Sequence, residues 1–136
     1  MKDSDTLVLI DDEYVSLRVH RRDKIVHHEL RKFVHGERLR NVLNQGLDAF
    51  IRYGASKWLS DDRGNGALSA SDSEWARTSW SPRVMAANWK FWAVVLPENV
   101  IGQMNMKMWM KAYADQGVIA QPFSDPIEAM EWLKRQ

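Results

Sequence analysis

The feature that most constrains the fold is the alternation of strand-like and helix-like segments over the second half of the chain. Short apolar runs predict strands, and the longer segments between them have the period of a helix. Strands separated by helices are joined by right-handed crossovers and lie parallel in one sheet. We expect strands at 57–60, 91–96 and 120–123, and helices at 71–88, 99–116 and 126–134.

The first third of the chain predicts antiparallel strands. In 14–20 apolar and polar residues alternate, and strand-like segments also occupy 6–10 and 24–34. Connections as short as these form antiparallel hairpins. Between Gly36 and Gly54 the apolar period changes to that of a helix, which Gly54 ends. The fold class expected is therefore α/β, with N-terminal antiparallel hairpins followed by a parallel part of the same mixed sheet and about four helices.

Local signals refine two of these helices. Ser71 and Glu74 have the spacing of a capping box, so we expect the second helix to begin there. Pro82 lies inside the same helix and is expected to kink it. Asp125 and Pro126 are a cap and a first-turn proline for the last helix.

Composition excludes several classes of protein. The 136 residues have the size of one domain, 1–136, and no repeat or linker divides them. Lys and Arg total 19 against 18 Asp and Glu, a net charge of +1, so no nucleic-acid partner is expected. No cysteine is present, which excludes disulfides and thiolate metal sites. The longest apolar run, 91–97, is too short to cross a bilayer, and the N-terminus lacks a signal-peptide pattern, so a cytoplasmic location without integral membrane association is expected.

Five short motifs follow one another along the chain. They are Gly36-Glu37-x-Leu39, Gly54-Ala55-x-Lys57-Trp58-Leu59-x-Asp61, Trp75 to Trp80-x-Pro82, Ala93-Val94-Val95-x-Pro97 and Glu128-Ala129-x-Glu131-Trp132-Leu133. With the expected element order, they make nearly the whole chain resemble the STAS-like, SpoIIAA-like superfamily. More narrowly, the chain resembles small stand-alone bacterial proteins that are similar to both STAS and CRAL-TRIO domains.

This resemblance implies a non-enzymatic regulatory module that docks onto partner proteins and needs no cofactor. Some STAS domains are switched by phosphorylation of a serine in an Asp-Ser-x-Gly pattern after a central strand. The corresponding stretch here is Asp61-Asp62-Arg63-Gly64, with aspartate in place of the serine, so the switch is not implied. CRAL-TRIO relatives bind lipophilic ligands, in cavities built by longer chains.

A candidate polar site combines Asp61, Asp62 and Arg83. The two aspartates follow the strand 57–60, at the edge where open α/β sheets form ligand crevices. Arg83 falls within the apolar face of its helix, so one aspartate is its natural partner if it points inward. The alternatives are that Arg83 extends outward beyond Pro82 and that the aspartates only cap a loop.

Neither catalysis nor metal binding is expected. The sequence fixes no base or activated nucleophile beside the aspartates. The four histidines lie at 20, 27, 28 and 35, with His27 and His28 on opposite faces of their strand, so they cannot meet at one metal ion.

The helix expected at 99–116 has two apolar stripes. One contains Val100, Ile101, Met104, Met108 and Ala112, and the other contains Met106, Trp109, Met110 and Tyr113. One stripe is enough to cover a sheet, so the other is available for a partner. We expect the second stripe to be the interface of a homodimer or of another protein contact, because aromatic residues and Met are enriched in interface cores. The alternatives are that neighbouring helices bury both stripes, or that an apolar ligand covers one.

Seven tryptophans in one small chain support a second hypothesis for the function. Tryptophans near the ends of the strands could line a site for a small or lipophilic ligand. The simpler explanation is an aromatic core.

Overall fold

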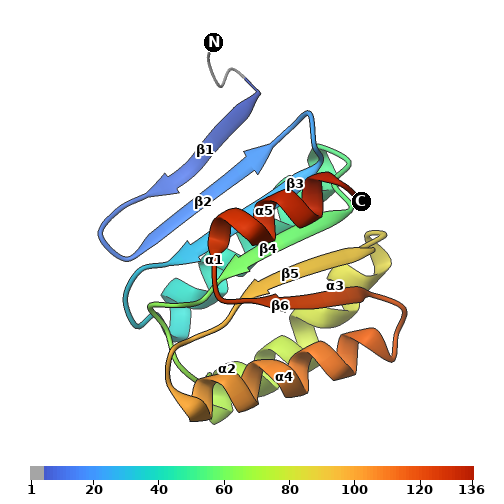
Figure 1. Ribbon diagram of the computed structural model, residues 1–136. Helices are drawn as coiled ribbons and strands as arrows, with labels where there is room; N and C mark the ends of the chain where they lie inside the picture. The colour runs from blue at the N-terminus through green and yellow to red at the C-terminus, as the bar shows by residue number, and fades with distance from the viewer. Residues whose placement is uncertain (1–4) are drawn as a thin grey trace.

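Residues 5–136 are described in the computed structural model, in which six strands form one mixed sheet (Figure 1). The strands are β1 (Thr6–Asp11), β2 (Val15–His20), β3 (Ile25–Leu30), β4 (Lys57–Asp61), β5 (Phe91–Val95) and β6 (Ile119–Phe123). They lie in the sheet in chain order. The pairs β1–β2 and β2–β3 are antiparallel, and the remaining pairs are parallel. The α/β class and the mixed sheet predicted from the sequence are confirmed.

Four helical segments cover the sheet. They are α1 (Gly36–Arg52), a continuous segment made of α2 (Ala70–Trp75), η1 (Ala76–Trp80) and α3 (Ser81–Ala86), then α4 (Val100–Ala114) and α5 (Pro126–Lys134). Because the parallel strands follow chain order, right-handed crossovers carry the first three segments to the same face of the sheet. The last helix, α5, folds back across the opposite face (Figure 1).

The two faces of the sheet carry separate cores. The larger core lies under the three crossover segments and includes Phe50, Trp58, Trp80, Trp89, Trp92 and Tyr113. The smaller core lies under α5 and includes Ile25, Leu59, Ala93, Val95, Ala129 and Leu133. Every residue of β4 is buried, as expected for a parallel strand that is covered on both faces.

Helix α1 approaches the sheet most closely at Gly46. A Cβ atom there would lie 2.7 Å from Cη2 of Trp58, a distance that no relaxed packing allows. The absence of a side chain therefore lets the large indole of Trp58 fit between helix and sheet, where Phe50 also packs against it. This contact fixes the position of Trp58 on β4.

Two local predictions are wrong. The strand expected at 24–34 ends at Leu30, and the chain then runs irregularly to α1. The second helix is capped by Ser69, whose side chain accepts from the amide of Asp72, so Ser71 and Glu74 form no capping box. The kink expected at Pro82 stays a prediction: Pro82 is the second residue of α3 and directly follows the π-helical turn η1.

Other signals are confirmed. Asp125 caps α5 by accepting from the amide of Ile127, and Pro126 occupies the first turn. Gly54 follows the end of α1 with a φ of +63°, a backbone conformation that favours glycine. Within residues 5–136, no helix combines the length and the apolar character needed to cross a bilayer.

Candidate functional site

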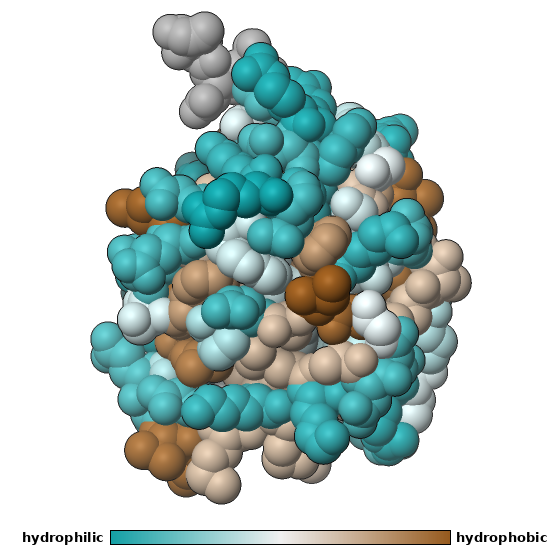
Figure 2. All heavy atoms as spheres, turned by 45° about the vertical axis from the view of Figure 1, so that its right-hand side comes forward, coloured by the Kyte–Doolittle hydropathy of each residue, from teal (hydrophilic) through white to brown (hydrophobic). Residues whose placement is uncertain are grey.

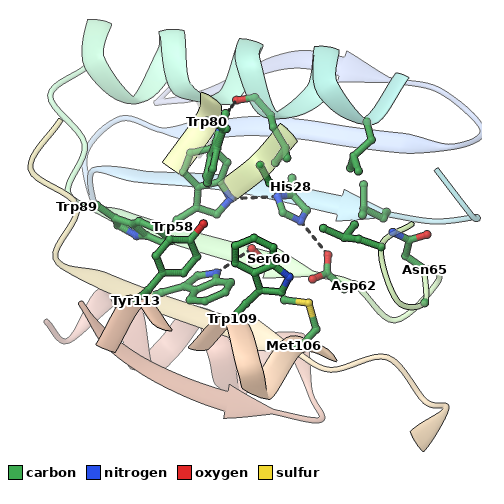
Figure 3. A pocket seen from close by; sticks show the side chains of 17 residues that line it. His28, Trp58, Ser60, Asp62, Asn65, Trp80, Trp89, Met106, Trp109 and Tyr113 are labelled. Carbon is green, nitrogen blue, oxygen red and sulfur yellow. Dashed lines mark hydrogen bonds and ion pairs between the residues drawn. The ribbon is translucent and has the colours of Figure 1, made fainter. Parts of the chain in front are cut away.

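A pocket lies between the sheet and the helices α1, η1 and α4 (Figure 3). Its volume is about 80 Å³, and a single water molecule needs only roughly 10–15 Å³. The lining residues are His28, Leu30, Leu39, Leu43, Trp58, Ser60, Asp62, Asn65, Gly66, Leu68, Ala76, Trp80, Trp89, Trp92, Met106, Trp109 and Tyr113. Figure 3 shows His28, Asp62 and Asn65 at one end of this space and Trp89 and Tyr113 at the other.

The walls of the pocket are aromatic side chains that pack against one another. Trp58 and Trp80 meet edge to face with their ring centroids 5.4 Å apart. Trp89 lies 4.8 Å from the ring of Tyr113, and Trp109 stacks on the same ring at 5.7 Å. Aromatic pairs at such distances stabilise a fold by roughly 0.5–1.5 kcal/mol each beyond the area that they bury. The walls are therefore built as one connected aromatic cluster.

The indole N–H groups of the pocket tryptophans are used differently. Four of them donate within the protein: Trp58 to His28, Trp80 to the carbonyl of Leu43, Trp89 to the carbonyl of Phe91, and Trp92 to the hydroxyl of Ser60. In the described part of the chain, no acceptor lies within hydrogen-bond distance of the fifth, on Trp109. Trp109 is only partly buried, so its N–H is left for the pocket or its mouth.

At the polar end of the pocket, three side chains form a chain of hydrogen bonds. Nε1–H of Trp58 donates to Nδ1 of His28 at 3.0 Å, and Nε2 of His28 lies 2.9 Å from Oδ1 of Asp62. An indole nitrogen can only donate, so Nδ1 must be the unprotonated nitrogen of the ring. Nε2 therefore carries the proton and donates it to the carboxylate of Asp62.

The carboxylate of Asp62 is buried but incompletely bonded. Only 6% of the residue is exposed, and Oδ1 accepts the hydrogen bond from His28. Among residues 5–136, no donor is within hydrogen-bond distance of Oδ2. The side chain lines the pocket, so this second oxygen is the strongest unused acceptor there.

The loop after β4 holds Asp62 and Asn65 in place. The amide of Gly64 donates to the carbonyl of Leu30 at 3.2 Å, and Oδ1 of Asn65 accepts from the amide of Val34 at 3.1 Å. A Cβ atom on Gly64 would lie 2.3 Å from the carbonyl oxygen of Arg31, so only glycine permits this close approach. Because Oδ1 of Asn65 is used, its amide nitrogen is the group left to donate at the pocket.

Tyr113 closes the opposite end of the pocket as a neutral phenol. Its hydroxyl is hydrogen-bonded to the hydroxyl of Ser81, and burial raises the pKa of Tyr113 to about 12. It contributes an apolar ring to the wall and no charge at neutral pH.

The structure separates the three residues of the predicted polar site. Successive residues of a strand point to opposite faces, and Asp61 lies on the α5 side, where Arg63 binds both of its carboxylate oxygens at 2.9 and 2.8 Å. Only Asp62 belongs to the pocket. Arg83 is exposed and donates to the side chain of Asn44 and to the carbonyl of Ser79, so its predicted pairing with an aspartate is wrong and the outward alternative is observed.

The assignment of the two stripes of α4 also needs correction. The stripe expected at an interface, Met106, Trp109, Met110 and Tyr113, faces the sheet and contributes to the larger core. Three of its four residues are buried, and Trp109 is partly buried. The stripe left outside is the other one, with Val100, Ile101, Met104 and Met108 each between 62% and 72% exposed. Figure 2 shows hydrophobic side chains along the lower edge of the molecule, where α4 lies in Figure 1.

The histidines fall into separate places. His27 and His28 lie on opposite faces of β3, as predicted, and His35 stacks on Phe33. The sequence interpretation missed that His20 on β2 reaches His27, with Nε2 of His20 3.1 Å from Nδ1 of His27. In the described residues, no three histidine or acidic side chains come together in a way that could hold a metal ion.

Sequence reasoning did not find His28 and Asn65 as parts of the site. One signal was available for His28: in a strand that alternates faces, it shares the face of Val26, which is in the larger core. No sequence signal indicates Asn65, because its position depends on the fold of the loop.

The partly buried pair His20 and His27 makes the fold sensitive to acid. Burial lowers the pKa of His27 to about 3, and the pKa of His20 is lowered for the same main reason. Between an unfolded pKa of 6.5 and this value, the unfolded chain binds a proton that the folded chain does not, so stability falls as the pH falls. From about pH 7 to about pH 5, His27 should lower the free energy of unfolding by about 2 kcal/mol.

Urea denaturation of His27→Gln at both pH values tests this expectation. The variant should lose most of that part of the acid dependence, whereas His35→Gln, which changes an exposed histidine, should keep it. An unchanged acid dependence in His27→Gln would contradict the uncharged state of His27 in the folded chain.

Comparison of the chain with family models, curated proteins and solved structures gives no match.

Proposed function

We propose that this protein is a non-enzymatic binding domain whose ligand is a small molecule held in the aromatic pocket. The observation that carries the proposal is the pocket itself, which joins five tryptophans to a polar end made by Asp62 and Asn65. Ligand sites commonly have this composition, with mainly apolar walls and a few placed polar groups. The polar end lies beyond the carboxyl end of β4, where open α/β sheets usually bind their ligands.

The hydrogen bonds of the pocket favour binding over catalysis. Both ring nitrogens of His28 are engaged, one by Trp58 and one by Asp62, so neither is free to take a proton from a ligand. Ser60 accepts from Trp92, and among residues 5–136 no base is hydrogen-bonded to its hydroxyl. A nucleophile needs an adjacent base, so these groups fit a role in orienting a ligand.

We also propose that the fold is of the STAS-like, SpoIIAA-like type. The element order supports this, since three strands are followed by an alternation of helix and strand that ends in a helix. The strand order, which follows the chain from β1 to β6, supports it as well.

Small probe molecules test the proposed ligand site. We expect benzyl alcohol, benzylammonium or benzoate at millimolar concentration to change the tryptophan fluorescence and raise the Tm by mass action. Trp109→Ala removes a wall of the pocket and should weaken probe binding about tenfold. Trp132→Ala removes a partly buried tryptophan in the smaller core and is the matched control, with unchanged affinity expected. If none of the three probes binds the unaltered chain, the proposed function is wrong.

A second candidate function is protein contact through the exposed stripe of α4. Its four large apolar residues, Val100, Ile101, Met104 and Met108, have the spacing of a helix face that packs on another helix. We commit to a second copy of the chain as the occupant, because the same stripe can then meet itself across a two-fold axis.

Light scattering at high micromolar concentration tests this candidate. A dimer is expected, and Met104→Lys combined with Met108→Lys should convert it to a monomer, because the charges cannot be buried against a partner. Lys107→Ala and Lys111→Ala, on the polar side of the same helix, should leave the dimer intact. A monomeric unaltered chain would exclude the candidate.

A further inference from the structure

We propose that the ligand of the pocket is a small organic cation, an ammonium group on an apolar body, with the ammonium placed at Asp62. This inference rests on the proposed binding function and adds the charge of the ligand. It follows from how the charges around the pocket are balanced.

Within residues 5–136, Asp62 forms no ion pair with a Lys or Arg side chain. No Lys or Arg of this described range lines the pocket. Arg63 is next in sequence but binds both oxygens of Asp61 on the opposite face. The only side chain paired with Asp62 among residues 5–136 is His28, and the N–H of Trp58 keeps Nδ1 of that ring unprotonated. The pocket therefore carries a negative charge that nothing in the described chain neutralises.

The geometry leaves this charge available to a ligand. Oδ1 is held by His28 at 2.9 Å, which orients the carboxylate, while Oδ2 lacks a donor in the described residues. A buried carboxylate oxygen that lacks a donor is costly, and a charged donor offers the strongest compensation. An ammonium at Oδ2 supplies both the opposite charge and a hydrogen bond.

The aromatic walls of the pocket also favour a cationic ligand. Trp58, Trp80 and Trp109 line the same pocket as Asp62 (Figure 3). Cations are attracted to aromatic faces, most strongly to tryptophan, and the attraction grows when water is excluded. The apolar part of the ligand would pack toward Trp89 and Tyr113 at the other end. The N–H groups of Trp109 and Asn65 can donate to a hydroxyl or carbonyl oxygen on the same molecule, but they carry no formal charge to balance an anion.

Three probes of similar shape separate the effect of charge from that of size. Benzylammonium, benzyl alcohol and benzoate share one ring and differ in the charge of the head group. Titration calorimetry on the unaltered chain should show benzylammonium binding about tenfold or more tightly than benzyl alcohol, with benzoate weakest. Equal or tighter binding of benzyl alcohol or benzoate would overturn the inference while leaving the proposed binding function in place. If none of the three binds, both proposals fail.

Asp62→Asn tests the assigned residue. The amide keeps an oxygen that can accept from His28, so the change removes the charge and little else. Affinity for benzylammonium should fall about tenfold, and affinity for benzyl alcohol should stay within about twofold. Asp61→Asn removes the same charge on the opposite face and is the control, with the preference for the cation unchanged. If Asp62→Asn keeps the preference for benzylammonium over benzyl alcohol, the inference is overturned. If this variant folds poorly, the comparison of the three probes on the unaltered chain still decides the inference.

Discussion

The hydrogen bond from Trp58 to His28 is the interaction on which the rest of the site depends. It fixes which ring nitrogen carries the proton, and this in turn fixes which oxygen of Asp62 is occupied and which is left to the pocket. Trp58 is fully buried between Gly46 of α1 and the ring of Trp80. The residue that anchors the larger core thus also sets the hydrogen bonding of the polar end.

The fold supplies the space for such a site because all three crossover segments lie on one face of the sheet. They bring α1, η1 and α4 over the parallel strands, and side chains of all three reach the same pocket. The opposite face is closed by α5 over small and branched residues, with Asp61 neutralised there by Arg63. Neighbouring aspartates on one strand end therefore have different roles: one completes an ion pair, and the other remains an open acceptor.

The sequence predicts the elements of this fold better than the details of its site. The hydrophobic period and the Gly, Pro and capping residues predict the sheet, the four helical segments and both stripes of α4, because these follow from local burial. They do not decide which stripe faces the sheet, since Met106 and Met108 are equally apolar and only tertiary packing distinguishes them. From the sequence, the tryptophans could form either a ligand site or an aromatic core. In the structure, the same rings belong to the larger core and line the pocket. The position of Asn65 and the pairing of His28 with Asp62 depend on the loop after β4 and on contacts between residues far apart in the sequence. The periodicity of the sequence does not indicate such contacts.

The protonation of His28 is the measurement that tests this account most directly. Long-range proton–nitrogen NMR spectra at neutral pH distinguish a nitrogen that carries a proton from one that does not. We expect Nε2 of His28 to carry the proton and Nδ1 to be unprotonated, with the Trp58 indole proton hydrogen-bonded to it. A proton on Nδ1, alone or together with one on Nε2, would contradict the hydrogen-bond chain and with it the unbalanced carboxylate in the pocket.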